Sequence, residues 1–192
     1  MKDIVLIGGG GHCKAAIDVI EQEGLFNIIG IIDKPEKIGE NVLEYQVIGD
    51  DSELIILLKS CKNALITIGQ IKSPYPRIKL FNKLLQLGFK LPTIVSPRAY
   101  ISKHSSIGIG SIIMHDAVIN AGVVIGENCI INTKSIIEHG SNIKNHCHIS
   151  TNAVINGEVV LGEGSFIGSC AVTKECIKID NNFFAKAGSV IK

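Results

Sequence analysis

The sequence predicts a small α/β domain over residues 1–96 and a parallel β-helix of hexapeptide repeats over residues 97–192. Two observations support this prediction: a glycine-rich turn between an apolar strand and a helix near the N-terminus, and a six-residue period of aliphatic residues in the second half. A hydrophobic share of 46% is enough for a packed core. The balance of 19 Lys and Arg against 18 Asp and Glu lacks the excess of cations that nucleic-acid binding requires, so no nucleic-acid partner is expected.

Short apolar runs alternate with segments of helical spacing in the first half. Strands are expected at residues 3–7, 28–32 and 64–68, and helices at residues 15–23, 51–60 and 77–87. Such alternation is typical of a small parallel sheet covered by helices. Residues 92–97, which begin and end with proline, are expected to link the two halves.

A run of four glycines follows the first strand and precedes the first helix. Such a turn lets backbone N–H groups at a helix N-terminus approach a phosphate, and Asp33 ends the second strand where an acidic residue commonly binds a ribose. Cys13 replaces the third glycine of the dinucleotide fingerprint, and the domain is too short for a full NAD site. We expect a nucleotide-linked sugar with its diphosphate over Gly9, Gly10 and Gly11; a tight turn without a ligand is the alternative.

The second half carries a large aliphatic residue at every sixth position. These residues are Ile101, Ile107, Ile113, Ile119, Ile125, Ile131, Ile137, Ile143, Ile149, Ile155, Leu161 and Ile167. The residue four positions after each of them is small, from Ser105 to Ala171. This pattern is typical of a β-helix whose triangular coils consist of three hexapeptides each. The period fails at Thr173 and resumes at Ile179, which predicts a loosened final coil.

Outward histidines are the candidates for chemistry on the β-helix. His139 is expected on the outer face, and Gly157 lies 18 residues later, one coil above it. An imidazole with a glycine above it has room for a thin reactive group; an ordinary exposed histidine is the alternative. His146 and His148 flank the inward Cys147 and are expected to point outward, which does not suit a shared ion, so no metal is expected.

The cellular compartment is predicted from the apolar runs and the cysteines of the sequence. No apolar run approaches the roughly 20 residues of a membrane helix, and the apolar N-terminal run is too short for a signal peptide. The six cysteines form no C-x-x-C motif and are expected to be free thiols. We therefore expect a cytoplasmic protein without a membrane partner.

The arrangement resembles that of the bacterial sugar acetyltransferases, a family that includes sialic acid O-acetyltransferases and UDP-4-amino-sugar N-acetyltransferases. The resemblance covers nearly the whole chain and is carried by G-G-G-G-H at the first turn, I-I-N-T-K-S-I-I-E-H-G at 130–140, H-I-S-T-N-A-V-I-N-G at 148–157 and F-I-G-S at 166–169. It implies a Rossmann-like first domain, a left-handed β-helix and acetyl-CoA as co-substrate. It also implies a homotrimer with active sites between neighbouring subunits.

The resemblance also implies roles for individual residues. His139 corresponds to the general base that takes a proton from the attacking amine or hydroxyl. Four residues are expected on the acetyl-CoA side: Asn132, His148, Gly157 and Gly168. Eight residues are expected to contact the sugar nucleotide: Gly9, Gly10, Gly11, His12, Asp33, Ile68, Gly69 and Arg77.

The predicted function is acetyl-CoA-dependent N-acetylation of the 4-amino group of a UDP-linked amino sugar, in bacterial surface-glycan or nonulosonic acid biosynthesis. O-acetylation of sialic acid or a sialic-acid-like sugar is one alternative, and a non-catalytic β-helix scaffold is another. Gly140, directly after the base, resembles the O-acetyltransferases, because N-acetyltransferases often carry an acidic residue there. His12 and His148 resemble the N-acetyltransferases.

Overall fold

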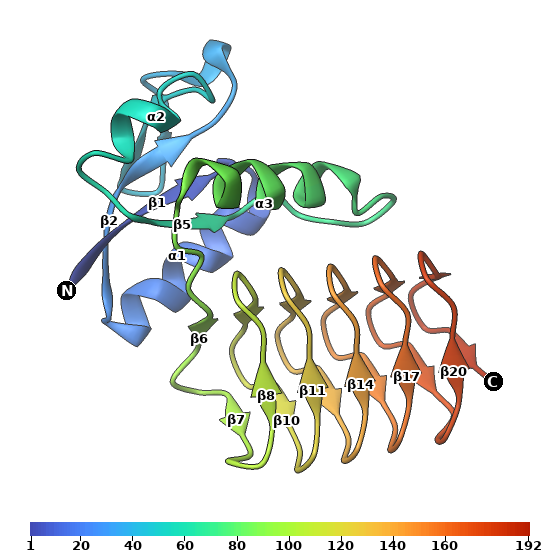
Figure 1. The fold of residues 1–192 in the computed structure, drawn as a ribbon. Coiled ribbons are helices and arrows are strands. Elements are labelled where there is room, and N and C mark those ends of the chain that lie inside the picture. Colours follow the sequence, from blue (N-terminus) through green and yellow to red (C-terminus); the bar gives the residue numbers. More distant parts are fainter. The chain divides into compact units, whose positions relative to one another are not determined.

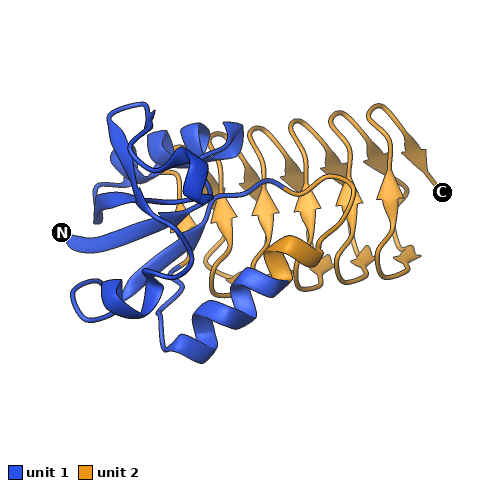
Figure 2. Cartoon of the chain, turned by 90° about the horizontal axis from the view of Figure 1, so that it is seen from above, with its two compact units in different colours: residues 1–69, 79–92 blue, residues 70–78, 93–192 orange.

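A computed structural model describes all residues, 1–192, and their contacts divide the chain into two units. Unit 1 consists of residues 1–69 and 79–92, and unit 2 consists of residues 70–78 and 93–192 (Figure 2). The segment 70–78 thus packs with the second unit although it lies in the first half of the sequence. Strand β6 (Ile94–Val95) lies in the expected linker and pairs with the β-helix strand β9 (Ile112–Ile113), so unit 2 resumes before residue 97.

Unit 1 contains a five-stranded sheet in the order β3-β4-β2-β1-β5 (Figure 1). Its strands are β1 (Lys2–Ile7), β2 (Phe26–Ile32), β3 (Asn41–Val42), β4 (Tyr45–Gly49) and β5 (Asn63–Ile66). Its helical segments are α1 (Gly11–Glu23), the 3-10 helix η1 (Pro35–Lys37), α2 (Leu54–Leu57) and α3 (Tyr75–Leu87), the first turn of α3 belonging to unit 2. Strands β1, β2, β4 and β5 are parallel, so their carboxyl ends meet at one edge of the sheet.

Two elements of unit 1 differ from the sequence prediction. The helix expected at residues 51–60 is a single turn, α2, because only Leu54 of its four residues is buried while Ile55 and Ile56 are exposed. The hairpin of β3 and β4 was not predicted. Strand β4 alternates between exposed and buried residues and pairs with β2, but its short pattern is weak in sequence.

Unit 2 is a β-helix of two-residue strands in three parallel sheets. The β15 face contains β6, β9, β12 (Ile130–Ile131), β15 (His148–Ile149), β18 (Phe166–Ile167) and β21 (Phe184–Ala185). The β13 face contains β7 (Tyr100–Ile101), β10 (Val118–Ile119), β13 (Ile136–Ile137), β16 (Val154–Ile155), β19 (Val172–Thr173) and β22 (Val190–Ile191). The β14 face contains β8 (Ser106–Ile107), β11 (Val124–Ile125), β14 (Asn142–Ile143), β17 (Val160–Leu161) and β20 (Lys178–Ile179). The predicted left-handed parallel β-helix of hexapeptide repeats is confirmed.

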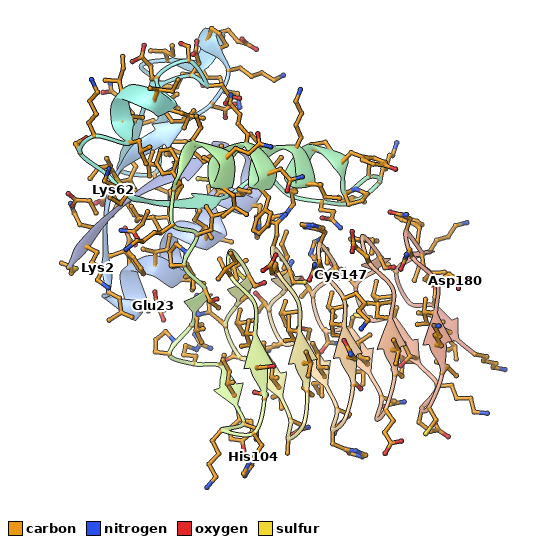
Figure 3. All side chains as sticks on the ribbon, viewed as in Figure 1. Lys2, Glu23, Lys62, His104, Cys147 and Asp180 are labelled. Atoms are coloured by element: carbon orange, nitrogen blue, oxygen red, sulfur yellow. The ribbon has the colours of Figure 1, made fainter.

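The core of unit 2 follows the two predicted columns. The aliphatic column from Ile113 to Ile167 is buried, and so is the small column from Ser111 to Ala171, which includes the inward Cys147 labelled in Figure 3. Burial of each aliphatic side chain stabilises the folded state by roughly 1.5 to 3 kcal/mol, and every coil repeats this contribution.

The prediction of a loosened final coil is wrong. Thr173 is 1% exposed, occupies the aliphatic position of strand β19, and pairs with Ile191 of β22. Its hydroxyl oxygen accepts the backbone N–H of Asn156 at 2.9 Å, so the polar atom is satisfied inside the coil.

A third column with a six-residue period was not predicted. Fourteen corner residues have a positive φ: Gly110, Asp116, Gly122, Asn128, Lys134, Gly140, His146, Asn152, Glu158, Gly164, Cys170, Cys176, Asn182 and Gly188. Gly, Asn and Asp occupy most of these positions because they adopt the left-handed conformation at the lowest cost. This column explains Gly140, whose φ is 68°.

Both long helices have 13 residues, and no helix has the length and hydropathy to cross a bilayer.

Candidate active site

The turn between β1 and α1 leaves open space at the helix N-terminus. Gly8 has a φ of 106°, and a Cβ there would collide with the side chain of Ile68, so this position requires glycine. A Cβ at Gly10 or Gly11 would meet no atom within 4 Å. Free N–H groups at a helix N-terminus favour an anion, and this turn therefore offers room for a phosphate.

Asp33 holds the glycine turn in place. Its Oδ2 accepts the backbone N–H of Gly9 at 2.7 Å and the ammonium of Lys37 at 3.1 Å, and its Oδ1 accepts the backbone N–H of Lys34 at 2.8 Å. Burial favours the protonated acid, but these hydrogen bonds outweigh it, so the pKa of Asp33 lies below its ordinary value. The carboxylate is charged at neutral pH.

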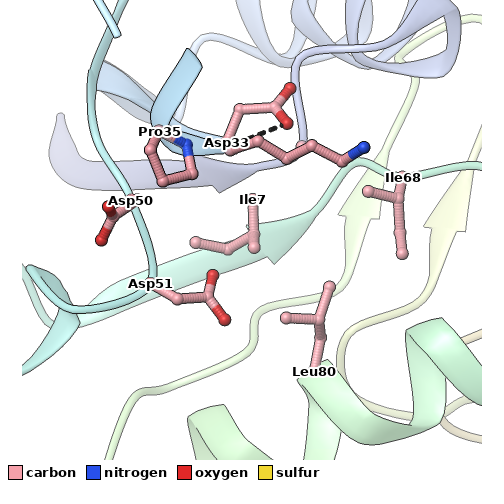
Figure 4. A pocket seen from close by; sticks show the side chains of 9 residues that line it. Ile7, Asp33, Pro35, Asp50, Asp51, Ile68 and Leu80 are labelled. Atoms are coloured by element: carbon pink, nitrogen blue, oxygen red, sulfur yellow. Dashed lines mark hydrogen bonds between the residues drawn. The ribbon is translucent and has the colours of Figure 1, made fainter. Parts of the chain in front are cut away.

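A cavity of 390 Å³, here the β1 cavity, opens at the carboxyl ends of the parallel strands (Figure 4). It is lined by Ile7, Gly8, Asp33, Lys34, Pro35, Asp50, Asp51, Ile68 and Leu80. Ligands of open α/β sheets bind at this edge, and apolar walls with a few polar groups suit a nucleoside. The expected residues Asp33 and Ile68 line the cavity, whereas Gly69 lies beside His12, with 3.8 Å between a Cβ at Gly69 and that of His12.

His139 lies in the turn between β13 and β14, where its side chain is exposed. A cavity of 490 Å³, here the His139 cavity, is lined by Glu138, His139, Asn156, Gly157, Glu158, Glu175 and Cys176. A Cβ at Gly157 would lie 2.8 Å from Cε1 and 2.9 Å from Nε2 of the imidazole. The predicted pairing of His139 with a glycine one coil above is confirmed, and only glycine leaves that face of the ring free.

His148 and Asn132 form a second group on the β15 face. The Nδ1 of His148 is bonded to the backbone carbonyl of Gln70 at 2.5 Å, and the Nε2 lies 3.2 Å from Nδ2 of Asn132. Phe166 packs edge-on against the imidazole with ring centroids 5.1 Å apart. Burial lowers the pKa of His148 to about 4, so the ring is neutral at pH 7.

His146 and His148, expected to point outward and thus to be exposed, are buried, since each is 7% exposed. The segment 70–78 covers them: Nε2 of Gln70 donates to the carbonyl of His146 at 2.8 Å. Nothing in the hexapeptide pattern indicates which part of the chain lies over a given coil, and so this cover was not predictable from the repeats.

Arg77 lies in the same covered region and does not line the β1 cavity. It is 1% exposed, and its Nη2 donates to Oδ1 of Asn128 at 2.6 Å. The side-chain amide of Asn128 in turn bonds to Nδ1 of His146 at 3.0 Å. Burial lowers the pKa of Arg77 to about 10, so its charge remains at pH 7. The residue expected to contact the nucleotide is therefore an anchor of the segment 70–78.

Gly168 is buried on the β15 face next to the turn of the following coil. A Cβ there would lie 2.5 Å from the backbone nitrogen of Ala187, so close stacking of coils requires glycine at this position. Its N–H donates to the carbonyl of Ala185 at 3.0 Å.

The expected acetyl-transfer residues thus form two groups within one chain. His139 and Gly157 share a corner between the β13 and β14 faces, whereas His148 and Asn132 lie at the β15 face. The His139 cavity contains neither Asn132 nor His148. Gln70, which contacts His148, was not predicted and carries no motif.

Comparisons with known proteins place the chain among sugar acetyltransferases. Residues 3–84 match the family described as PglD N-terminal domain. A histidine-to-asparagine mutant of perosamine N-acetyltransferase from Caulobacter crescentus, in complex with CoA and GDP-perosamine, is 30% identical, with a TM-score of 0.94 over 100% of this chain and 89% of that chain. The acetyltransferase domain of PglB from Neisseria gonorrhoeae is 28% identical, with a TM-score of 0.91 over 100% of this chain and 92% of that chain. The complex of that domain with acetyl coenzyme A has a TM-score of 0.87 at 28% identity, over 99% and 92% of the two chains.

Proposed function

The chain belongs to the bacterial sugar acetyltransferases, and we propose that it transfers the acetyl group of acetyl-CoA to the amino group of a nucleotide-linked amino sugar. The observation that carries this proposal is the exposed imidazole of His139 beneath Gly157, with one ring face open to a reactant. The β1 cavity and its glycine turn supply the second requirement, a site for a nucleotide diphosphate. One solved relative is a complex with CoA and GDP-perosamine, and another is a complex with acetyl coenzyme A.

In the proposed mechanism, the sugar amine attacks the thioester carbonyl while His139 takes its proton. The C–N bond forms, the carbonyl becomes a tetrahedral oxyanion, and the C–S bond then breaks to release the CoA thiolate. The proton on His139 passes to the leaving thiolate, so the products are an acetamide and CoA. The backbone N–H of Gly157 has no partner in the chain and suits a carbonyl oxygen beside His139.

We propose the 4-amino group of a UDP-linked amino sugar as the acceptor. A GDP-linked amino sugar is the other acceptor to test, because one relative is in complex with GDP-perosamine. The resemblance of Gly140 to the O-acetyltransferases has a simpler explanation. Gly140 has a φ of 68°, and the corner column alone accounts for a glycine there.

We propose a homotrimer as the active form. His139 lies on one corner of the β-helix, and the pair of Asn132 and His148 lies on another face, so a neighbouring copy is needed to bring the two groups together. The reaction belongs in the cytoplasm, where acetyl-CoA is available, and the unpaired state of all six cysteines supports this location.

The test is a panel of acceptors incubated with the purified chain and acetyl-CoA. The panel contains UDP- and GDP-linked 4-amino sugars, sialic acid and CMP-sialic acid. Products are measured by mass spectrometry, because the exposed Cys170 and Cys176 would react with reagents that detect released CoA. We expect a mass gain of one acetyl group on an amino sugar and its loss in His139→Ala. Acetylation of sialic acid alone would establish the O-acetyltransferase alternative, and no acetylation of any acceptor would favour the scaffold.

A further inference from the structure

The imidazole of His148 is held by three neighbours. The carbonyl of Gln70 contacts Nδ1, the amide of Asn132 contacts Nε2, and the ring of Phe166 packs against it at an interplanar angle of 78°. None of these contacts depends on a second copy of the chain.

The contact with Gln70 determines which nitrogen carries the proton. A backbone carbonyl can only accept a hydrogen bond, so Nδ1 must be the protonated nitrogen. Burial and the positive charge of Arg77, the charged group that faces His148, both disfavour a second proton on the ring. His146, the neighbouring histidine on the same coil, is also held below its ordinary pKa by burial. His148 is therefore a neutral ring with a lone pair on Nε2.

The lone pair of His148 then determines how the amide of Asn132 is oriented. Its Nδ2 must face Nε2, because only a donor satisfies a lone pair. The Oδ1 of Asn132 accepts the backbone N–H of Thr133 at 2.8 Å, which requires the same orientation of the amide. One N–H of Asn132 donates to His148, and the second N–H remains free for a ligand.

We infer that Gln70 is a positioning residue for acetyl transfer: its carbonyl fixes His148 in the Nδ1–H form, so that Asn132, and not His148, offers a second N–H donor to the thioester carbonyl beside that of Gly157. This inference rests on the proposed function. The Gln70 carbonyl is itself held in place, because the side chain of Gln70 bonds to the carbonyl of His146 and Arg77 anchors the segment 70–78 to Asn128.

The first test reads the tautomer directly. Protein labelled with ¹⁵N in its histidine rings is examined by long-range ¹H–¹⁵N correlation from pH 6 to 8, with His148 identified by the signal lost in His148→Gln. A second identification comes from Phe166→Leu, which removes the adjacent ring. We expect the Nδ1–H pattern without titration in this range. An Nε2–H pattern, or an imidazolium at pH 7, would overturn the inference.

The second test uses Asn132→Asp. The carboxylate cannot donate to Nε2, so His148 must take a second proton to satisfy both neighbours, and its ring signals should titrate near neutral pH. Because the carboxylate has no N–H for the thioester, kcat should fall by about 100-fold. Unchanged ring signals together with normal kcat would contradict the inference.

The third test separates positioning from folding. Gln70→Ala removes the anchor of the carbonyl, and we expect mixed tautomer signals of His148 together with a kcat about tenfold lower. Lys72→Ala, an exposed position in the same segment, is the matched control and should retain the Nδ1–H pattern and kcat. An unaltered pattern in Gln70→Ala would assign Gln70 a structural role only. An inactive wild type with the Nδ1–H pattern would instead refute the proposed function and leave the tautomer assignment standing.

Discussion

At the scale of single residues, Gly157 leaves one face of the His139 imidazole free for its proposed role as the base. Its φ is not in the left-handed region, so the backbone tolerates alanine, and the fold gives no reason of its own for glycine here. A Cβ would instead lie 2.8 Å from the imidazole, where a reactant must approach. The 18-residue spacing made this pair visible in sequence, because stacking of coils converts a spacing into a contact.

Gly157→Ala is expected to lower kcat by roughly 10- to 100-fold with little change in the free energy of unfolding. The exposed imidazole can move away from the new methyl group, which preserves the fold but displaces the base. Steady-state kinetics and urea denaturation check both statements. In a His139→Ala background the same substitution should cost no further activity, and an equal additional loss there would show that Gly157 acts independently of His139.

The buried His148 predicts how stability depends on pH. The unfolded imidazole takes a proton near pH 6.5, whereas the folded ring does so near pH 4. Between these values the unfolded state binds more protons, so the free energy of unfolding rises with pH. The stabilisation is complete above about pH 6.5 and is lost toward pH 4, on the order of 3 kcal/mol.

Urea denaturation between pH 4 and 7 measures this slope. His148→Gln should make this slope shallower, because the difference in proton binding at residue 148 disappears and only the contribution of other groups, such as the buried His146, remains. His104→Gln, at an exposed histidine labelled in Figure 3, is the control and should leave the slope unchanged. An unchanged slope in His148→Gln would assign the whole effect to His146 or another buried group.

At the scale of elements, the β-helix was predictable from the sequence, whereas the segment 70–78 that covers His146 and His148 was not. The six-residue period places a large aliphatic residue at twelve successive positions, so a single exception such as Thr173 does not obscure the pattern. The corner column of Gly, Asn and Asp carries a signal of the same period that could also have been found. The segment 70–78 has no such signal, because its place is determined by tertiary contacts of Gln70 and Arg77.

The β1–α1 turn predicts different outcomes for two neighbouring glycines. Gly10→Val adds a side chain to open space, so the fold should tolerate it while the acceptor KM rises at least tenfold and acetyl-CoA affinity stays the same. Gly8→Ala forces a Cβ onto Ile68 at a positive φ and should destabilise the protein by more than about 1 kcal/mol. Steady-state kinetics and thermal unfolding distinguish the two variants. An unchanged acceptor KM in Gly10→Val would show that the diphosphate does not bind at this turn.

At the scale of the whole molecule, the two groups of candidate residues lie on different faces of the β-helix, so one chain alone does not bring them together. His139 is positioned by the coils that form the β13 and β14 faces, and Asn132 by the β15 face. The repeat pattern places each residue on its face but contains no information about a neighbouring chain. The homotrimer is therefore a prediction that only solution measurements test, beginning with a sedimentation mass three times that of the 20.6 kDa chain.

Mixing two inactive variants tests whether neighbouring chains share the site. His139→Ala lacks the base and Asn132→Ala lacks the proposed donor, so each homotrimer should be inactive. If one subunit supplies His139 and the next supplies Asn132, every mixed trimer contains one interface of its three with both residues, and the isolated mixed trimers should recover roughly a third of wild-type activity. Coexpression with two affinity tags isolates the mixed trimers. Wild-type chains carrying the same tags give the reference activity, and mixed trimers that stay inactive would place the complete site within a single subunit.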